Sequence, residues 1–236
     1  MGAAMKKWGF CLFVVVSLSG ISLLSPSPDY DGNLIQMFAN PAWSAESAGG
    51  GEKVSKSGIP YVSDTPPAGS EELYNAIRAR RGGQLANLDR MLLNSPEFAR
   101  GWNTMFAAIR GKLDVSLKLR ELAIVTIGVM NKADYELEAH APIFLSAGGS
   151  QEQLNAIKKG VPAAIKNTKL FDESERATLA LTYEMTRDVT VKKATMAKIR
   201  SILPTRQVVE LIGTIAGYNM VSRFLVATGI DPEEAK

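Results

Sequence analysis

The feature that most constrains the fold of this chain is a series of helix start signals in its C-terminal two-thirds. Ser150 with Gln153, and Asp172 with Glu175, have the spacing of a capping box. From residue 70 onward, no segment shows the period-two alternation that is typical of a half-buried strand. The sequence therefore predicts an all-α domain over residues 70–236.

Other N-cap residues, glycines and prolines divide the rest of this region into helices. Ser95, Pro96 and Glu97 supply an N-cap, a first-turn proline and a first-turn acid. Similar signals place further helix starts near residues 71, 84, 117, 131, 191 and 206. The helix from residue 117 is apolar on every side beyond Glu121, so we expect it at the centre of the domain.

The N-terminal region has a different character. Lys6 and Lys7 precede an apolar run over residues 8–24, which predicts that residues 1–25 are an export signal, either cleaved or kept as a membrane anchor. A buried helix of the main domain is the alternative. Residues 26–69, rich in Gly, Ser and Pro in their second half, are interpreted as a flexible linker. We therefore expect an exported protein, periplasmic or anchored facing the periplasm, that contacts the membrane only through this segment.

Composition and motifs exclude several classes of function. Hydrophobic residues make up 46% and charged residues 22% of the 236 residues, and the net charge is +3, as in ordinary globular proteins. No basic block with interleaved aromatics supports nucleic-acid binding. No histidine or cysteine cluster has metal-ligand spacing, and no phosphate loop is present, so we expect no metal and no cofactor. Cys11 is the only cysteine, so the exported part has no thiol chemistry.

The only histidine, His140, is the first candidate for chemistry. It shares a helix face with Glu136, one turn earlier, and an (i, i+4) carboxylate can fix the tautomer of an imidazole and tune it for proton transfer. Tyr135 lies beside this pair. The alternative is a histidine that is simply satisfied within the core.

Glu121 is the second candidate because it lies along an apolar helix face, where desolvation raises the pKa of a carboxyl. The alternative is a structural ion pair with Arg120 or Arg223. In the last helix, Tyr218, Asn219 and Arg223 interrupt an apolar run. They are expected either to line a site or to form a stabilising hydrogen-bond network.

Three motifs carry a resemblance to a known family: R-E-L-A-I at 120–124, Y-E-x-x-x-H at 135–140 and Y-N-M-V-S-R-F at 218–224. Over about residues 70–232 the chain resembles the carboxymuconolactone decarboxylase family of the alkylhydroperoxidase D-like superfamily. The resemblance implies that superfamily's helical fold, a homo-oligomer such as a trimer or hexamer, and a shared glutamate and histidine at Glu121 and His140.

The same resemblance argues against a thiol peroxidase. In the peroxidase branch two cysteines would fall at Ala133 and Glu136, and neither position holds sulfur here. The chain is therefore similar to the cysteine-free branch. Family membership alone fixes the location of a site more firmly than its reaction.

These expectations favour an enzyme that performs acid–base chemistry on a small carboxylated or lactone substrate, of decarboxylase or isomerase type. His140 would move the proton, Glu121 and Glu136 would orient it or share the relay, and Tyr135 would donate to an oxyanion. Asn219 or Arg223, with Tyr218 beside them, would hold the substrate. The alternative is a non-catalytic binding or assembly protein on the same fold.

Overall fold

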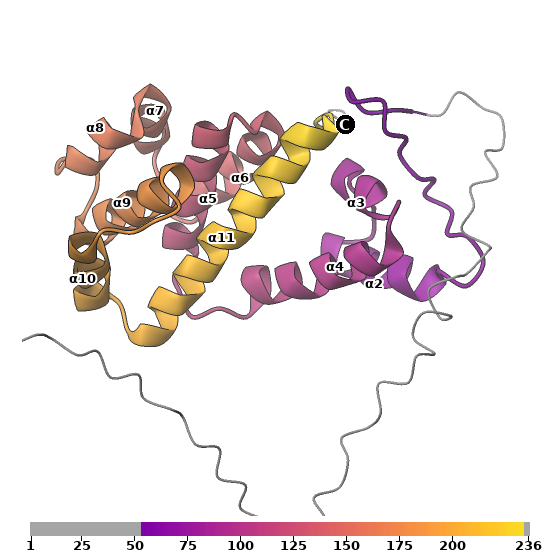
Figure 1. The fold of residues 1–236 in the computed structure, drawn as a ribbon, viewed down its shortest axis with the longest axis horizontal. Helices are drawn as coiled ribbons and strands as arrows, with labels where there is room; N and C mark the ends of the chain where they lie inside the picture. Colours follow the sequence, from indigo (N-terminus) through magenta and orange to yellow (C-terminus); the bar gives the residue numbers. More distant parts are fainter. Residues whose placement is uncertain (1–52, 234–236) are drawn as a thin grey trace, which may run out of the picture. The chain divides into compact units, whose positions relative to one another are not determined.

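The computed structural model describes residues 53–233, so the predicted export segment and most of the predicted linker lie outside the described residues. Within this range the chain forms ten helices and no extended sheet; its β-structure is a single isolated bridge between Val54 and Pro60. Figure 1 shows the helices with colours that follow the sequence from α2 to α11. The predicted all-α fold class is confirmed.

The helices begin and end close to the predicted signals. Ser150 and Gln153 exchange side-chain hydrogen bonds with each other's backbone N–H, as do Asp172 and Glu175, so both predicted capping boxes are present. A six-residue helix, α8, follows Gly160 and is absent from the sequence prediction. The bounds are α2 Glu71–Arg81, α3 Asn87–Leu92, α4 Pro96–Gly111, α5 Leu117–Asn131, α6 Asp134–Ser146, α7 Gln151–Lys159, α8 Val161–Lys166, α9 Glu173–Arg187, α10 Lys193–Ile202 and α11 Thr205–Thr228.

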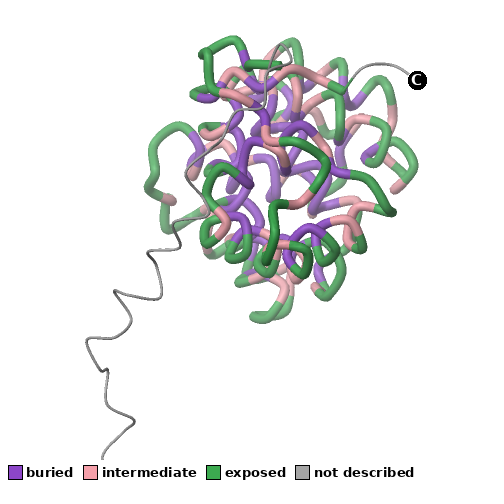
Figure 2. Tube along the Cα trace, turned by 90° about the vertical axis from the view of Figure 1, so that its right-hand side faces the viewer, coloured by how far each residue is buried: buried purple, intermediate pink, exposed green. Residues whose placement is uncertain are grey.

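Helix α5 forms the centre of the described domain. Every residue from Leu119 to Gly128 is buried, and the helix packs against α6, α9 and α11. Figure 2 shows buried segments surrounded by exposed ones. The all-round apolar surface of α5 is therefore covered within one subunit, and it gives no support to the predicted oligomer.

Exposed apolar side chains occur on several helices: Phe98 and Met105 on α4, Leu117 at the start of α5, Ile143 and Leu145 on α6, and Val209, Met220 and Val226 on α11. Assembly into an oligomer stays a prediction. None of the helices within residues 53–233 combines the length and the apolar character needed to cross a membrane.

Residues 53–69, predicted to belong to the linker, pack against the helical domain. Tyr61 is buried, and its hydroxyl accepts a hydrogen bond from the backbone N–H of Asp231. Lys56 donates a backbone hydrogen bond to Gly229, where a Cβ would approach the Lys56 Cβ to 2.9 Å. The domain thus begins before the predicted boundary at residue 70, because an extended segment held by backbone bonds has no helical periodicity to reveal it.

Candidate functional site

His140 and Glu121 meet in the interior, on α6 and α5. The His140 Nδ1 lies 2.7 Å from the Glu121 Oε2, and the two residues are 3% and 4% exposed. The alternative pairing of Glu121 with Arg120 is wrong, since Arg120 donates to the carbonyl of Ile109 at 2.9 Å. Arg223 likewise bonds elsewhere, to Asn219. Two residues 19 apart in sequence thus form one buried pair.

Arg110, on α4, completes the surroundings of the imidazole and is absent from the sequence prediction. Its Nη2 lies 3.3 Å from the His140 Nε2. A guanidinium only donates hydrogen bonds, so the Nε2 must accept with its lone pair. The Nδ1 therefore carries the proton and donates it to the Glu121 carboxylate, an arrangement that fixes the tautomer of the ring.

Tyr218, on α11, lies on the other side of this arginine. The Arg110 Nε donates to the Tyr218 hydroxyl at 3.0 Å, and the Tyr218 ring stands edge-on to His140 with 5.1 Å between ring centroids. Burial, opposed by the nearby Arg110 charge, raises the pKa of Tyr218. The phenol thus keeps its own O–H proton while it accepts from Arg110.

The imidazole is held neutral. Burial lowers the pKa of His140 below its ordinary value; the hydrogen bond and charge of Glu121 oppose this, and the charges of Arg110 and Arg81 add to it. At neutral pH the ring is therefore a free base with a proton on Nδ1. A neutral imidazole hydrogen-bonded to a carboxylate is the protonation state required of a general base.

Glu136, one turn before His140, is 2% exposed, and neither of its carboxyl oxygens has a hydrogen-bond partner. Burial raises its pKa well above the ordinary value, with the Arg110 charge opposing the rise and Glu121 adding to it. Burial therefore favours the neutral carboxylic acid at this position. Glu121, and not Glu136, is hydrogen-bonded to the imidazole of His140, so of the two carboxyl groups predicted to orient this ring only Glu121 can do so.

Tyr135 does not join these groups through its hydroxyl, which donates to the Glu233 carboxylate at 2.9 Å. Burial, together with Glu233, raises the pKa of Tyr135. Successive residues of a helix project about 100° apart, so Tyr135 and Glu136 leave α6 in different directions. The predicted oxyanion donor at Tyr135 is thus engaged elsewhere, and Tyr218 is the phenol beside His140.

Asn219 and Arg223 form a separate hydrogen-bond network. The Asn219 Oδ1 accepts from Arg223 at 2.7 Å and from Asn131 at 3.1 Å, while its Nδ2 donates to Thr186 at 3.0 Å. Asn131 also donates to Ser222 at 2.6 Å. This geometry matches a stabilising hydrogen-bond network. Neither Asn219 nor Arg223 contacts His140, so their predicted role in substrate binding has no support from the structure.

Further charges flank the site from α2 and α3. Arg80 and Arg81 both pair with Asp89, whose side chain is 1% exposed. With Arg110, three guanidiniums lie near three carboxyl groups, those of Asp89, Glu121 and Glu136, and burial favours the uncharged form of the last. Within residues 53–233, no group of three His, Cys, Asp or Glu side chains is arranged to hold a metal ion.

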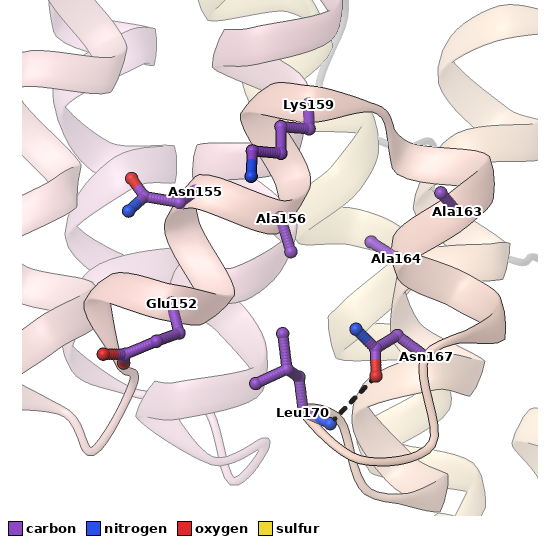
Figure 3. A pocket seen from close by; sticks show the side chains of 8 residues that line it. All are labelled: Glu152, Asn155, Ala156, Lys159, Ala163, Ala164, Asn167 and Leu170. Atoms are coloured by element: carbon purple, nitrogen blue, oxygen red, sulfur yellow. Dashed lines mark hydrogen bonds between the residues drawn. The ribbon is translucent and has the colours of Figure 1, made fainter.

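Two surface pockets lie outside this cluster. One, of about 380 Å³, opens at the start of α6 and includes Ala133, Tyr135 and Glu138 among its lining residues. The other, of about 440 Å³, lies between α7, α8 and the Asn167–Leu170 turn (Figure 3). Neither of these two pockets is lined by His140. The second is formed by Glu152, Asn155, Ala156, Lys159, Ala163, Ala164, Asn167 and Leu170.

Comparison with known families identifies the central part of the domain. Residues 96–165 match the model of the Carboxymuconolactone decarboxylase family. This stretch contains Arg110, Glu121, Glu136 and His140, whereas Tyr218 lies beyond it. No curated protein sequence matches the chain.

Solved structures share the fold at low identity. An uncharacterized peroxidase-related protein from Silicibacter sp. TM1040 is 20% identical, with a TM-score of 0.62 over 78% of this chain and 96% of its own. An alkylhydroperoxidase AhpD core protein from Ralstonia eutropha JMP134 is 16% identical, with a TM-score of 0.62 over 77% and 94%. The debrominase Bmp8, in complex with 2,3,4-tribromopyrrole, is 15% identical, with a TM-score of 0.60 over 74% and 90%.

The family match and the shared fold agree with the predicted resemblance. Over residues 96–165 the chain matches the carboxymuconolactone decarboxylase family, and its fold is that of alkylhydroperoxidase D-like proteins of known structure. Ala133 and Glu136, where the resemblance implies that a peroxidase would carry its two cysteines, hold no sulfur.

Proposed function

We propose that this protein is an enzyme that moves protons on a small substrate carrying a carbonyl or lactone group and a carboxylate. The observation that carries the proposal is the buried His140–Glu121 pair, 2.7 Å apart, beside a neutral carboxyl at Glu136 that lacks a partner. A base and an acid whose pKa values are shifted in opposite directions within one interior cluster are the pair that acid–base catalysis needs.

In the first step, the His140 Nε2 takes a proton from the substrate carbon next to the carbonyl. The electron pair of the broken C–H bond moves to the carbonyl oxygen and forms an enolate. Glu121 holds the Nδ1–H and stabilises the imidazolium that forms. Tyr218, protonated and beside the ring, is placed to donate to the developing oxyanion.

In the second step, for a substrate whose enolate is extended by a conjugated C=C bond, Glu136 gives a proton to the terminal carbon of the dienolate, which completes an isomerisation. The proton taken by His140 and the proton lost by Glu136 are then restored by exchange with solvent. For decarboxylation, a C–C bond breaks in place of the C–H bond and its electron pair enters the conjugated carbonyl. Carbon dioxide leaves, and Glu136 supplies the proton to the carbon. Burial raises the pKa of Glu136 above its ordinary value, which favours the protonated form that a proton donor needs.

The relatives support a small-molecule substrate. The debrominase Bmp8 binds 2,3,4-tribromopyrrole, a small flat ring, on the same fold. A thiol peroxidase is disfavoured because peroxide reduction of that kind needs a thiolate and a resolving thiol. Neither Ala133 nor Glu136 can supply one.

A second candidate is a non-catalytic binding protein. One observation favours it: the lone pair of the His140 Nε2 is already engaged by Arg110 at 3.3 Å, so the base is not free in the structure. In that case the cluster would recognise a ligand without transforming it.

The test is a screen of the purified protein against butenolide carboxylic acids and small keto acids, by thermal shift and then by NMR detection of products. For any substrate found, His140→Gln should lower kcat by about 10²- to 10⁴-fold with little change in KM. Glu138→Gln, an exposed carboxylate on the same helix, serves as the matched control and should keep its rate. Ligands that bind without turnover in the wild type would favour the binding protein. Retained turnover in a folded His140→Gln variant would refute the proposed base.

A further inference from the structure

Some arginines of the described domain bind carboxylates, as Arg80 and Arg81 do at Asp89. Arg120 and Arg223 lack an ion pair and bond instead to the Ile109 carbonyl and to Asn219. Arg110 also has no carboxylate within ion-pair distance among residues 53–233, and it differs from those two in its partners. Its hydrogen bonds go to two ring side chains, the Tyr218 hydroxyl and the His140 Nε2.

Arg110 has exposed surface, whereas Glu121, Glu136, His140 and Tyr218 are buried, but its guanidinium end is itself largely desolvated against Tyr218 and His140. A guanidinium has five N–H donors in a planar fork, and only two of them are used here. The remaining donors have no acceptor among residues 53–233, so a ligand that enters the cluster can use them. A carboxylate is the group that this planar fork binds best, through two parallel hydrogen bonds.

The local charge also favours an anion. The groups that face His140 come from five helices: Arg81 on α2, Arg110 on α4, Glu121 on α5, Glu136 on α6 and Tyr218 on α11. Three guanidiniums, those of Arg80, Arg81 and Arg110, lie near the carboxyl groups of Asp89, Glu121 and Glu136, and burial shifts the last of these toward its uncharged form. An entering anion would therefore meet a complementary field.

A cation on the lone pair of the imidazole suppresses its basicity. The Nε2 would need to lose the Arg110 hydrogen bond before it could accept a proton, and the nearby positive charge opposes protonation as well. The ligand-free site therefore holds its base in a masked state.

We propose that Arg110 masks the Nε2 of His140 in the ligand-free protein, and that a ligand carboxylate draws the guanidinium to itself and so frees the base. This inference rests on the proposed function, because it assigns a carboxylate to the substrate and a means of activation to the same site. Only a ligand that pairs with Arg110 would then meet an active imidazole. Arg110 is a positioning residue in this scheme, and it takes no proton itself.

The single histidine of the chain makes a direct test possible. Protein labelled with ¹⁵N-histidine gives one imidazole spin system, whose pKa can be followed by pH titration without assignment. The probe is levulinate, which carries a ketone and a carboxylate. Methyl levulinate, without the charge, and sodium chloride at equal ionic strength are the controls.

Levulinate should raise the pKa of His140 in the wild type, and the two controls should not. Arg110→Met should raise this pKa in the absence of ligand, since the masking charge is lost, and it should weaken levulinate binding by about 10- to 100-fold. Arg110→Lys retains the charge but lacks the fork, so it should keep the pKa low and still bind levulinate less well. Arg223→Met, the exposed arginine of the neighbouring network, is the matched control and should behave as wild type.

The masking proposal is overturned if saturating levulinate leaves the pKa of His140 unchanged in the wild type, a measurement that needs no variant to fold. It is also overturned if a folded Arg110→Met variant titrates as wild type does. Its failure is distinguishable from failure of the proposed function. If levulinate shifts the pKa of His140 but no substrate is turned over, the proposed function fails and the protein is a carboxylate receptor. If turnover depends on His140 but Arg110 has no effect, the masking proposal fails and the protein is an enzyme whose base is not masked.

Discussion

Tyr218 and Asn219 are neighbours in sequence on α11, yet they belong to two polar groups of opposite character. The His140 cluster, made of Arg110, Glu121, Glu136, His140 and Tyr218, contains a buried carboxyl with no hydrogen-bond partner. The Asn219 network, made of Asn131, Thr186, Asn219, Ser222 and Arg223, satisfies both ends of its central amide.

This difference indicates that the His140 cluster is a candidate functional site and that the Asn219 network stabilises the fold. Buried polar groups in native proteins are nearly always hydrogen-bonded, so an orphaned carboxyl needs an explanation, whereas a closed network does not. The Asn219 network has the geometry of a stabilising connection between α5, α9 and α11. The His140 cluster combines shifted pKa values with unused donors, which is characteristic of functional sites. Three substitutions test this distinction.

The largest expected effect is on stability. Asn219→Ala removes the shared partner of Asn131, Thr186 and Arg223, so it should lower the free energy of unfolding by about 2–4 kcal/mol. The melting temperature should then fall by about 5–15 °C. The pKa of His140, read from the histidine NMR signal, should stay at its wild-type value. An unchanged melting temperature with lost ligand binding would instead place Asn219 in the site.

A pH-dependent effect is expected for Glu136→Gln. Because the folded protein raises the pKa of Glu136, the folded state binds more protons than the unfolded chain at and above pH 4.5, and stability falls as pH rises toward the folded pKa. The variant lacks this loss. The free energy of unfolding of the variant, relative to that of the wild type, should therefore increase with pH by at most about 1.4 kcal/mol for each pH unit. Its melting temperature relative to the wild type should rise accordingly.

Thermal melts of both proteins between pH 4.5 and 8.5 would measure this difference. Glu138→Gln is the control, because Glu138 is exposed on the same helix and its replacement should give a difference that is flat with pH. A flat difference for Glu136→Gln as well would mean that Glu136 is ionised and paired in solution, and the proposed proton donor would be lost.

The smallest effect is expected for Arg223→Ala. Arg223 is exposed and donates to Asn219 from the edge of the network, so its loss should cost about 1 kcal/mol or less. The melting temperature should change by about 4 °C or less. Turnover of any substrate found in the screen should be unaffected. A large loss of substrate affinity would revive the predicted carboxylate-binding role of Arg223.

Much of the fold could be predicted from the sequence because helix signals are local. A capping box joins residues three positions apart, so Asp172 and Glu175 specify the start of α9 without reference to any other element. The segment over residues 53–69 shows the limit of this approach. Its position depends on Tyr61 and on backbone hydrogen bonds to residues far along the chain, and its composition alone suggested a linker.

The candidate site was predictable only in part. Helical spacing placed Glu136 and His140 on one face, the apolar face of its helix singled out Glu121, and the family resemblance associated Glu121 with His140. Helical spacing also separates Tyr135 from that face, so its inclusion was the weaker step. No signal in the sequence pointed to Arg110, an arginine near the end of an amphipathic helix.

The sequence by itself determined the helical class, the helix starts and the residue types available for chemistry, because these follow from interactions within one or two turns. The tertiary structure decided which of those residues meet. Arg110 reaches Tyr218 across 108 positions, and His140 pairs with Glu121 across 19. Such contacts depend on how α4, α5, α6 and α11 pack, and packing is set by side chains from the whole core rather than by any single segment.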